Sequence, residues 1–300
     1  MNIENQQIDL PLFREKKVEL FIKREDLIHP IISGNKYRKL KYNIQAAKAN
    51  NVLVLLSFGG AYSNHIAATA CLGKEYGFKT IGVIRGEELT TKWESNPTLK
   101  QAKEHGMYLH FVTRETYRKK EDTKFLNELK SVFGDFYLIP EGGTNILAVQ
   151  GCQEILTEND THFNVVCSCV GTGGTLAGLS NAAKPNQRVL GFPVLKGDFL
   201  KDDIRKFAEN ENWKLISDYH FGGYAKLNID LVNFINNFKR DTKIQLDPIY
   251  TGKLFYGLFD LISKNYFKAG TKILAIHSGG LQGISGMNIV LKKKKLPLLK

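Results

Sequence analysis

Short apolar runs alternate with segments of helical spacing along this chain, and this alternation constrains its fold more than any other feature. The run at 51–57 is continuously apolar, too short for a helix, and followed by Gly59 and Gly60, so it predicts a buried strand. Small and apolar residues at helical spacing follow at 63–76, and 79–85 returns to strand character. This order is typical of an α/β fold whose largely parallel sheet is covered on both faces.

The alternation continues to the end of the chain. We expect strands at 107–112, 136–139, 164–170 and 271–276, helices at 119–129, 145–156, 253–264 and 281–291, and further alternating segments at 176–183, 188–194 and 198–207. A length of 300 residues is roughly twice that of a usual domain. We therefore expect a smaller α/β domain at 46–150 and a larger one that combines 1–45 with 151–300.

The lengths of the apolar runs bear on where the protein is located, and the placement of the cysteines bears on whether it binds a metal. No uninterrupted apolar run approaches the roughly 18 residues of a membrane span, and the N-terminal segment lacks the basic and apolar regions of a secretory signal. We therefore expect a cytoplasmic protein with no membrane partner. Cys167 and Cys169 lie on a predicted strand without a second ligand pair, so we expect packing residues and no metal site.

The net charge of +12 raises the question of a nucleic-acid partner. The positive charge is mostly lysine, whereas recognition of bases and phosphates favours arginine. The densest cluster, 292–295, is typical of a solvated chain end. We expect no nucleic-acid partner, and the remote alternative is a non-catalytic basic protein that binds nucleic acid. Steep salt-dependent retention on DNA would support that alternative.

Four glycine-rich turns follow predicted strands and lead into helices, where free backbone N–H groups can hold an anion. They lie at 58–65, 140–145, 170–175 and 277–280. The third combines glycines with two hydroxyl side chains and suits a phosphate. It lacks the lysine of a nucleotide-binding loop, and Leu176 stands where a dinucleotide fingerprint needs glycine. Taken alone, it is equally consistent with a turn that binds nothing.

Charged residues gather upstream at 22–26 and 33–40, where Lys36 follows Ser-Gly-Asn at a predicted helix entry. The neighbouring cations Arg38 and Lys39 should help to lower the pKa of Lys36, and a free amine is what Schiff-base chemistry requires. Considered alone, the segment is better explained as the basic first turn of a helix.

Taken together, these segments resemble the fold-type II pyridoxal-phosphate enzymes, and among them the aminocyclopropanecarboxylate deaminase and D-cysteine desulfhydrase family. Seven segments occur in the family's order: IKRED at 22–26, SGNKYRKL at 33–40, FGGAYSNH at 58–65, PEGGTN at 140–145, VGTGGTLAGL at 170–179, DPIYTGK at 247–253 and IHSGG at 276–280. The resemblance implies two open, twisted, mostly parallel sheets covered by helices, with pyridoxal 5′-phosphate between two domains, a small amino-acid substrate and a homodimer.

The resemblance also implies roles for individual residues. Lys36 would form a Schiff base with the cofactor and later move the substrate α-proton. Asn64 would bind the 3′-oxygen of the ring, and Ser63 and His65 would join it in receiving the substrate carboxylate. The phosphate would lie in the cup formed by Gly171, Thr172, Gly173, Gly174 and Thr175.

Further residues are implied around the ring and the substrate. Tyr224 and Tyr250 match tyrosines that face the substrate in this family. Thr251 and Ser278 match positions that contact the cofactor, and Ser278 replaces a more frequent threonine. Ser33 stands where the family usually has glycine. His277 suits either a cofactor contact or packing beneath its loop.

Thr251 distinguishes two reactions. In the deaminases a glutamate follows the tyrosine of the DP-x-Y motif and keeps the pyridine nitrogen protonated, which a neutral hydroxyl cannot do. A weaker electron sink still suffices when a thiolate leaves, so the sequence favours α,β-elimination, with D-cysteine giving pyruvate, ammonia and hydrogen sulfide. His65 favours the same branch, because the deaminases have glutamine there. The alternative is deamination of 1-aminocyclopropane-1-carboxylate to 2-oxobutanoate and ammonia.

Overall fold

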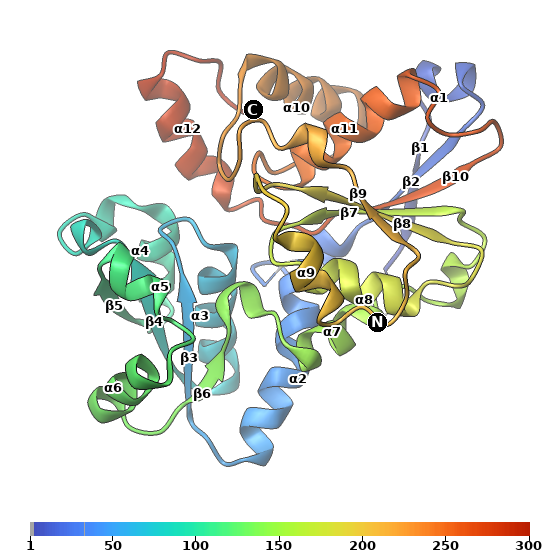
Figure 1. The fold of residues 1–300 in the computed structure, drawn as a ribbon. Coiled ribbons are helices and arrows are strands. Elements are labelled where there is room, and N and C mark those ends of the chain that lie inside the picture. Colours follow the sequence, from blue (N-terminus) through green and yellow to red (C-terminus); the bar gives the residue numbers. More distant parts are fainter. Residues whose placement is uncertain (1–2, 33) are drawn as a thin grey trace.

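The computed structural model describes residues 3–32 and 34–300, so Ser33 of the SGNKYRKL segment lies outside the described residues. Their strands form two sheets (Figure 1). The larger sheet has the order β1 (Asn5–Ile8), β2 (Glu19–Lys23), β10 (Lys272–Ile276), β7 (Val165–Val170), β8 (Arg188–Pro193), β9 (Trp213–Leu215). The smaller has the order β5 (Tyr108–Val112), β4 (Lys79–Arg85), β3 (Val54–Gly59), β6 (Tyr137–Ile139). All pairs are parallel except β1 with β2, which confirms the predicted α/β class with two mostly parallel sheets.

Helices cover both faces of the larger sheet. One face packs against α1 (Pro11–Glu15), α10 (Ile229–Thr242), α11 (Thr251–Ser263) and α12 (Gly283–Lys293). The other face packs against α7 (Ile146–Gln153), α8 (Gly174–Ala182) and α9 (Leu200–Arg205). Every residue of β7 is buried, as its continuous apolar run predicts for a central parallel strand.

The smaller sheet is covered in the same way. One face packs against α5 (Arg114–Arg118) and α6 (Thr123–Phe133). The other packs against α2 (Asn35–Ala49), α3 (Asn64–Tyr76) and α4 (Pro97–Glu104). The helix expected at 119–129 begins later, at Thr123, because Asp122 caps it by accepting a hydrogen bond from the Lys124 N–H at 2.8 Å. A separate short helix, α5, ends before this range at Arg118.

Helix α2 joins the two parts of the molecule (Figure 1). It contributes to the core of the smaller sheet and also packs closely on α7. A Cβ at Gly151 of α7 would lie 2.0 Å from the Arg38 carbonyl oxygen, so only glycine permits this approach. The domain limits at 46 and 150 stay a prediction. The strands of the smaller sheet fall between them, and α2 runs across position 46.

No helix of the described residues is both long and apolar enough to cross a membrane.

Candidate functional site

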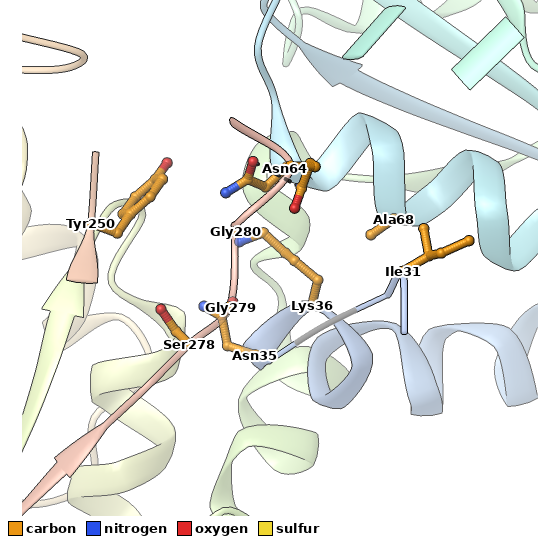
Figure 2. Close-up of a pocket in the computed structure, with 10 residues that line it drawn as sticks. Ile31, Asn35, Lys36, Asn64, Ala68, Tyr250, Ser278, Gly279 and Gly280 are labelled. Atoms are coloured by element: carbon orange, nitrogen blue, oxygen red, sulfur yellow. Dashed lines mark hydrogen bonds between the residues drawn. The ribbon is translucent and has the colours of Figure 1, made fainter. Parts of the chain in front are cut away.

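A pocket lies between the carboxyl ends of the two sheets. Its walls come from both parts of the chain: Ile31, Asn35, Lys36, Asn64, Ala68, Tyr250, Ser278, Gly279, Gly280 and Gln282. Figure 2 shows the Lys36 side chain reaching into the space between Asn64 and Ser278, with Tyr250 to one side. The carboxyl edge of parallel strands is where ligands bind in open α/β sheets, so the pocket is the candidate site.

The start of α2 is held in place by the 22–26 segment. The Gly34 N–H donates to the Glu25 carbonyl at 2.9 Å, and the Glu25 carboxylate accepts two hydrogen bonds from Arg38, at 2.8 and 2.9 Å. Gly34 has a φ of +64°, and a Cβ there would lie 1.9 Å from the Ser278 carbonyl oxygen. Glycine is therefore required where α2 passes the 277–280 turn.

The pKa of Lys36 is lowered, as the sequence predicts, but the neighbouring cations are not the main cause. Burial of the amine is the largest cause of the shift. Arg38 does not face the Lys36 amine as a free cation, because it is neutralised by its buried ion pair with Glu25. The consequence for the chemistry is the same, since a lowered pKa leaves more of the Lys36 amine unprotonated near neutral pH.

The 170–175 turn is contacted by side chains from two other segments, α2 and the 140–145 turn. Lys39 donates to the Thr144 hydroxyl at 2.8 Å, to the Gly142 carbonyl at 2.9 Å and to the Thr172 hydroxyl at 3.3 Å. Asn35 donates to the Thr175 hydroxyl at 2.8 Å. The structure thus brings the predicted cup together with the first two turns of α2.

Lys39 is the residue of this site whose position the sequence analysis missed. Only 2% of it is exposed, and among the described residues no carboxylate pairs with it. Burial, followed by the charge of Lys36, lowers the pKa of Lys39 to about 7. A buried cation beside a glycine-rich turn and without an anion of its own fits a bound phosphate ester. Its spacing from Lys36 could have revealed it, because positions three apart share one helix face.

Two polar side chains of the 58–65 turn, Ser63 and His65, make hydrogen bonds within the smaller-sheet part of the molecule. Ser63 caps α3 by accepting from the Ile66 N–H at 3.2 Å. The Nε2 of His65 lies 2.7 Å from the Ser57 hydroxyl, and neither Ser63 nor His65 lines the pocket. Burial is the main reason why the pKa of His65 lies well below its usual range, so the ring is neutral. Asn64 does line the pocket.

The DP-x-Y segment is organised by one buried carboxylate. Asp247 accepts from the backbone N–H groups of Ile249, Tyr250 and Thr251 at 2.7 to 3.0 Å. The Thr251 hydroxyl donates to the same carboxylate at 2.8 Å and accepts from the Asp247 N–H at 2.8 Å. Thr251 is fully buried and does not line the pocket. Its hydroxyl thus has both a donor and an acceptor inside its own turn.

Tyr250 lines the pocket, and Tyr224 packs against it edge to face, with ring centroids 6.2 Å apart. Burial raises the pKa of Tyr250 well above its usual range. Lys253 holds the Tyr224 loop by donating to the carbonyls of His220 and Gly223 at 2.8 Å each. The structure therefore brings together the two tyrosines that the sequence places far apart.

Ser278 lines the pocket beside a buried thiol, since the Cys169 Sγ lies 3.1 Å from its hydroxyl oxygen. Both Cys167 and Cys169 are buried in the core, as predicted. His277 does not line the pocket. Its Nε2 lies 2.7 Å from the Gln245 carbonyl, and its Nδ1 accepts from the Gly279 N–H at 3.2 Å. Of the two open interpretations of His277, the structure favours packing beneath the loop.

Comparisons with known proteins agree with this arrangement. The family model described as pyridoxal-phosphate dependent enzyme matches residues 6–279. A Pyrococcus horikoshii protein that carries the provisional name 1-aminocyclopropane-1-carboxylate deaminase is 32% identical over 90% of this chain and 87% of its own. A bifunctional D-cysteine desulfhydrase/1-aminocyclopropane-1-carboxylate deaminase of Arabidopsis thaliana is 29% identical over 89% of this chain and 73% of its own.

A solved structure described as an ACC deaminase homologue superimposes with a TM-score of 0.83 at 30% identity, covering 98% of this chain and 94% of the other. The matched family is pyridoxal-phosphate dependent, and the buried cation beside the glycine-rich cup fits the phosphate of that cofactor. The chain therefore belongs to the pyridoxal-phosphate-dependent enzymes, in the family of aminocyclopropanecarboxylate deaminases and D-cysteine desulfhydrases.

Proposed function

We propose that this enzyme is a lyase that eliminates the β-substituent of a small amino acid, with D-cysteine as the substrate. The reaction consumes D-cysteine and one water and releases pyruvate, ammonia and hydrogen sulfide, which balances all atoms. The Cα–H and Cβ–S bonds break, and water replaces the amino group after elimination.

Different residues around the pocket would bind different parts of the cofactor. The Lys36 amine would hold it covalently, and Asn64 would bind the ring 3′-oxygen. The backbone of 171–175 and the Lys39 cation would hold the phosphate, which needs the charge that Lys39 carries. When bound, the cofactor supplies the electron sink that stabilises negative charge at the α-carbon.

Lys36 would accept the substrate α-proton, and Tyr250 would assist the leaving group. Burial lowers the pKa of Lys36, so its amine can accept the α-proton once it is free. Burial keeps Tyr250 protonated, so its phenol can donate a hydrogen bond to the departing sulfur but cannot act as a base. The N-terminus of α3 would receive the substrate carboxylate through the backbone N–H groups of Asn64 and His65, since the Ser63 N–H donates to the Gly60 carbonyl and the Ile66 N–H donates to the Ser63 hydroxyl.

The chemistry of the pocket wall supports elimination. None of the described residues that line the pocket carries a carboxylate, and hydroxyl groups are contributed by Tyr250 and Ser278. Thr251 stands at the glutamate position, and its hydroxyl donates a hydrogen bond to the Asp247 carboxylate. Neutral groups support only a weak electron sink, which suits a good leaving group such as a thiolate better than a cyclopropane ring. We propose that Thr251 shapes this environment from behind Tyr250.

Deamination of 1-aminocyclopropane-1-carboxylate is the second candidate, because relatives in Pyrococcus and Bradyrhizobium carry that activity in their names. The two candidates make different keto acids and only one makes sulfide. Purified, cofactor-loaded enzyme should therefore be given D-cysteine, L-cysteine and the cyclopropane substrate in parallel.

We expect D-cysteine to give sulfide and pyruvate, with a kcat/KM at least about 100-fold above that for the conversion of the cyclopropane substrate to 2-oxobutanoate. A 100-fold ratio corresponds to roughly 3 kcal/mol of difference in transition-state stabilisation. A higher kcat/KM for the cyclopropane substrate would overturn the proposal in favour of the deaminase.

A homodimer, a cytoplasmic location and the lack of a nucleic-acid partner stay predictions. Light scattering tests the first, and retention on DNA at physiological ionic strength tests the last.

A further inference from the structure

We propose that Gln282 is a positioning residue that fixes the orientation of the Asn64 amide at the cofactor ring. The inference rests on the proposed role of Asn64 as the ligand of the ring 3′-oxygen. Gln282 follows the glycine turn after β10 and so belongs to the larger sheet, whereas Asn64 begins α3 beside the smaller sheet. The Gln282 Nε2 donates to the Asn64 Oδ1 at 3.0 Å, and both residues line the pocket.

This hydrogen bond decides which end of the Asn64 amide faces the ligand. An asparagine amide has an accepting oxygen and a donating nitrogen, and it can turn to exchange them. Because Oδ1 is engaged by Gln282, Nδ2 is the end that remains to donate. An oxygen that carries negative charge, such as the 3′-oxygen of the cofactor ring, needs a donor, and the opposite orientation would present a repelling oxygen.

The surroundings support a dedicated role for the Gln282 side chain. Gln282 occupies the N-cap position of α12, yet its side chain makes no capping hydrogen bond there. A Cβ at Gly280 would lie 2.6 Å from the Asn64 Nδ2, so glycine leaves room for the amide.

One turn further along α12, a Cβ at Gly286 would lie 2.6 Å from the Tyr62 ring. The start of α12 therefore contacts the 58–65 turn at two places. The contact at Gly286 is one of close packing, whereas the contact at Gln282 is a hydrogen bond.

The test is a double-mutant cycle on cofactor affinity with Gln282→Leu, Asn64→Ala and the double variant. We expect Gln282→Leu alone to weaken the affinity for pyridoxal 5′-phosphate by about fivefold to tenfold, the range of one neutral hydrogen bond. In the Asn64→Ala background the same change should have almost no effect. The exposed Gln150 provides the matched control, since Gln150→Leu should leave the affinity unchanged.

Gln282→Glu tests whether residue 282 sets the orientation of the Asn64 amide. A glutamate can only accept, so it would draw the Asn64 Nδ2 toward itself and turn Oδ1 to the ring. We expect a weaker affinity than in Gln282→Leu and an altered visible absorbance band of the bound cofactor, with the midpoint of thermal unfolding unchanged. Equal effects of Gln282→Leu with and without Asn64, or wild-type affinity in Gln282→Glu, would overturn the inference.

The double-mutant cycle measures only the affinity for the cofactor and requires no substrate turnover. If the enzyme releases no sulfide from D-cysteine, the proposed function fails while the inference about Gln282 is still decided.

Discussion

The glycine-rich turns at 58–65 and 170–175 both follow inner strands of their sheets and both lead into helices, yet they differ in what completes them. The 170–175 turn is surrounded by side chains from α2 and the 140–145 turn, with Lys39 at their centre. The 58–65 turn instead engages Ser63 and His65 in local contacts and leaves Asn64 facing the pocket. A glycine turn thus becomes an anion site when distant segments bring charge to it.

The largest expected difference between the two turns concerns the polar side chains that contact each of them. Lys39→Met should weaken the affinity for pyridoxine 5′-phosphate about 100-fold, because a buried charged hydrogen-bond donor is lost. This analogue keeps the phosphate but has no aldehyde to react with Lys36. Isothermal titration calorimetry measures the affinity.

Ser63→Ala is the counterpart in the other turn. It should change that affinity less than about threefold and lower the free energy of unfolding by about 1 kcal/mol, because the α3 cap is lost. Equal losses of affinity in the two variants would contradict the contrast between the turns.

The glycines of the two turns provide a second, smaller contrast. Gly173 has a φ of +83°, and a Cβ there would lie 2.7 Å from the Ile204 side chain. Gly173→Ala should therefore lower the free energy of unfolding by about 1–2 kcal/mol and weaken the affinity for pyridoxine 5′-phosphate by roughly tenfold.

At Gly60 a Cβ would lie 3.5 Å from the Arg85 guanidinium, an ordinary contact. Gly60→Ala should change the free energy of unfolding by no more than about 0.5 kcal/mol. Urea denaturation compares the two variants, and a larger cost at Gly60 would show that the 58–65 turn is the more constrained one.

The pH dependence of phosphate binding tests whether the charge of Lys39 is what distinguishes the 170–175 turn. The pKa of Lys39 is lowered to about 7, so in the unbound enzyme the cation loses its proton as the pH rises above that value. A phosphate ester stays dianionic there, because its second pKa is about 6.

The affinity for pyridoxine 5′-phosphate should therefore fall between about pH 7 and pH 9, by at most about tenfold per pH unit. In Lys39→Met the affinity should vary much less with pH. An affinity that rises with pH in the wild-type enzyme would show that Lys39 does not supply the charge.

The sequence predicted the central strands and both turns well, because buried parallel strands and glycine turns leave local signals. Strands β1 and β2 were missed, since they are short and only partly apolar, and they pair through contacts distant in the sequence. The same reason applies within the site. Nothing local shows that Glu25 neutralises Arg38 or that His65 turns to Ser57, because those partners are set by packing.

Lys36 lines the pocket, and Lys39 lies one helical turn further along α2, where it donates to the Thr172 hydroxyl. We propose that Lys36 holds the cofactor and that Lys39 holds its phosphate, and burial lowers the pKa of both amines. Borohydride reduction of the cofactor-loaded enzyme, followed by mass spectrometry of its peptides, measures which amine is modified. We expect the reduced cofactor on Lys36 alone, and loss of labelling in Lys36→Ala. Labelling of Lys39, or a colourless protein that takes up no cofactor, would contradict this account.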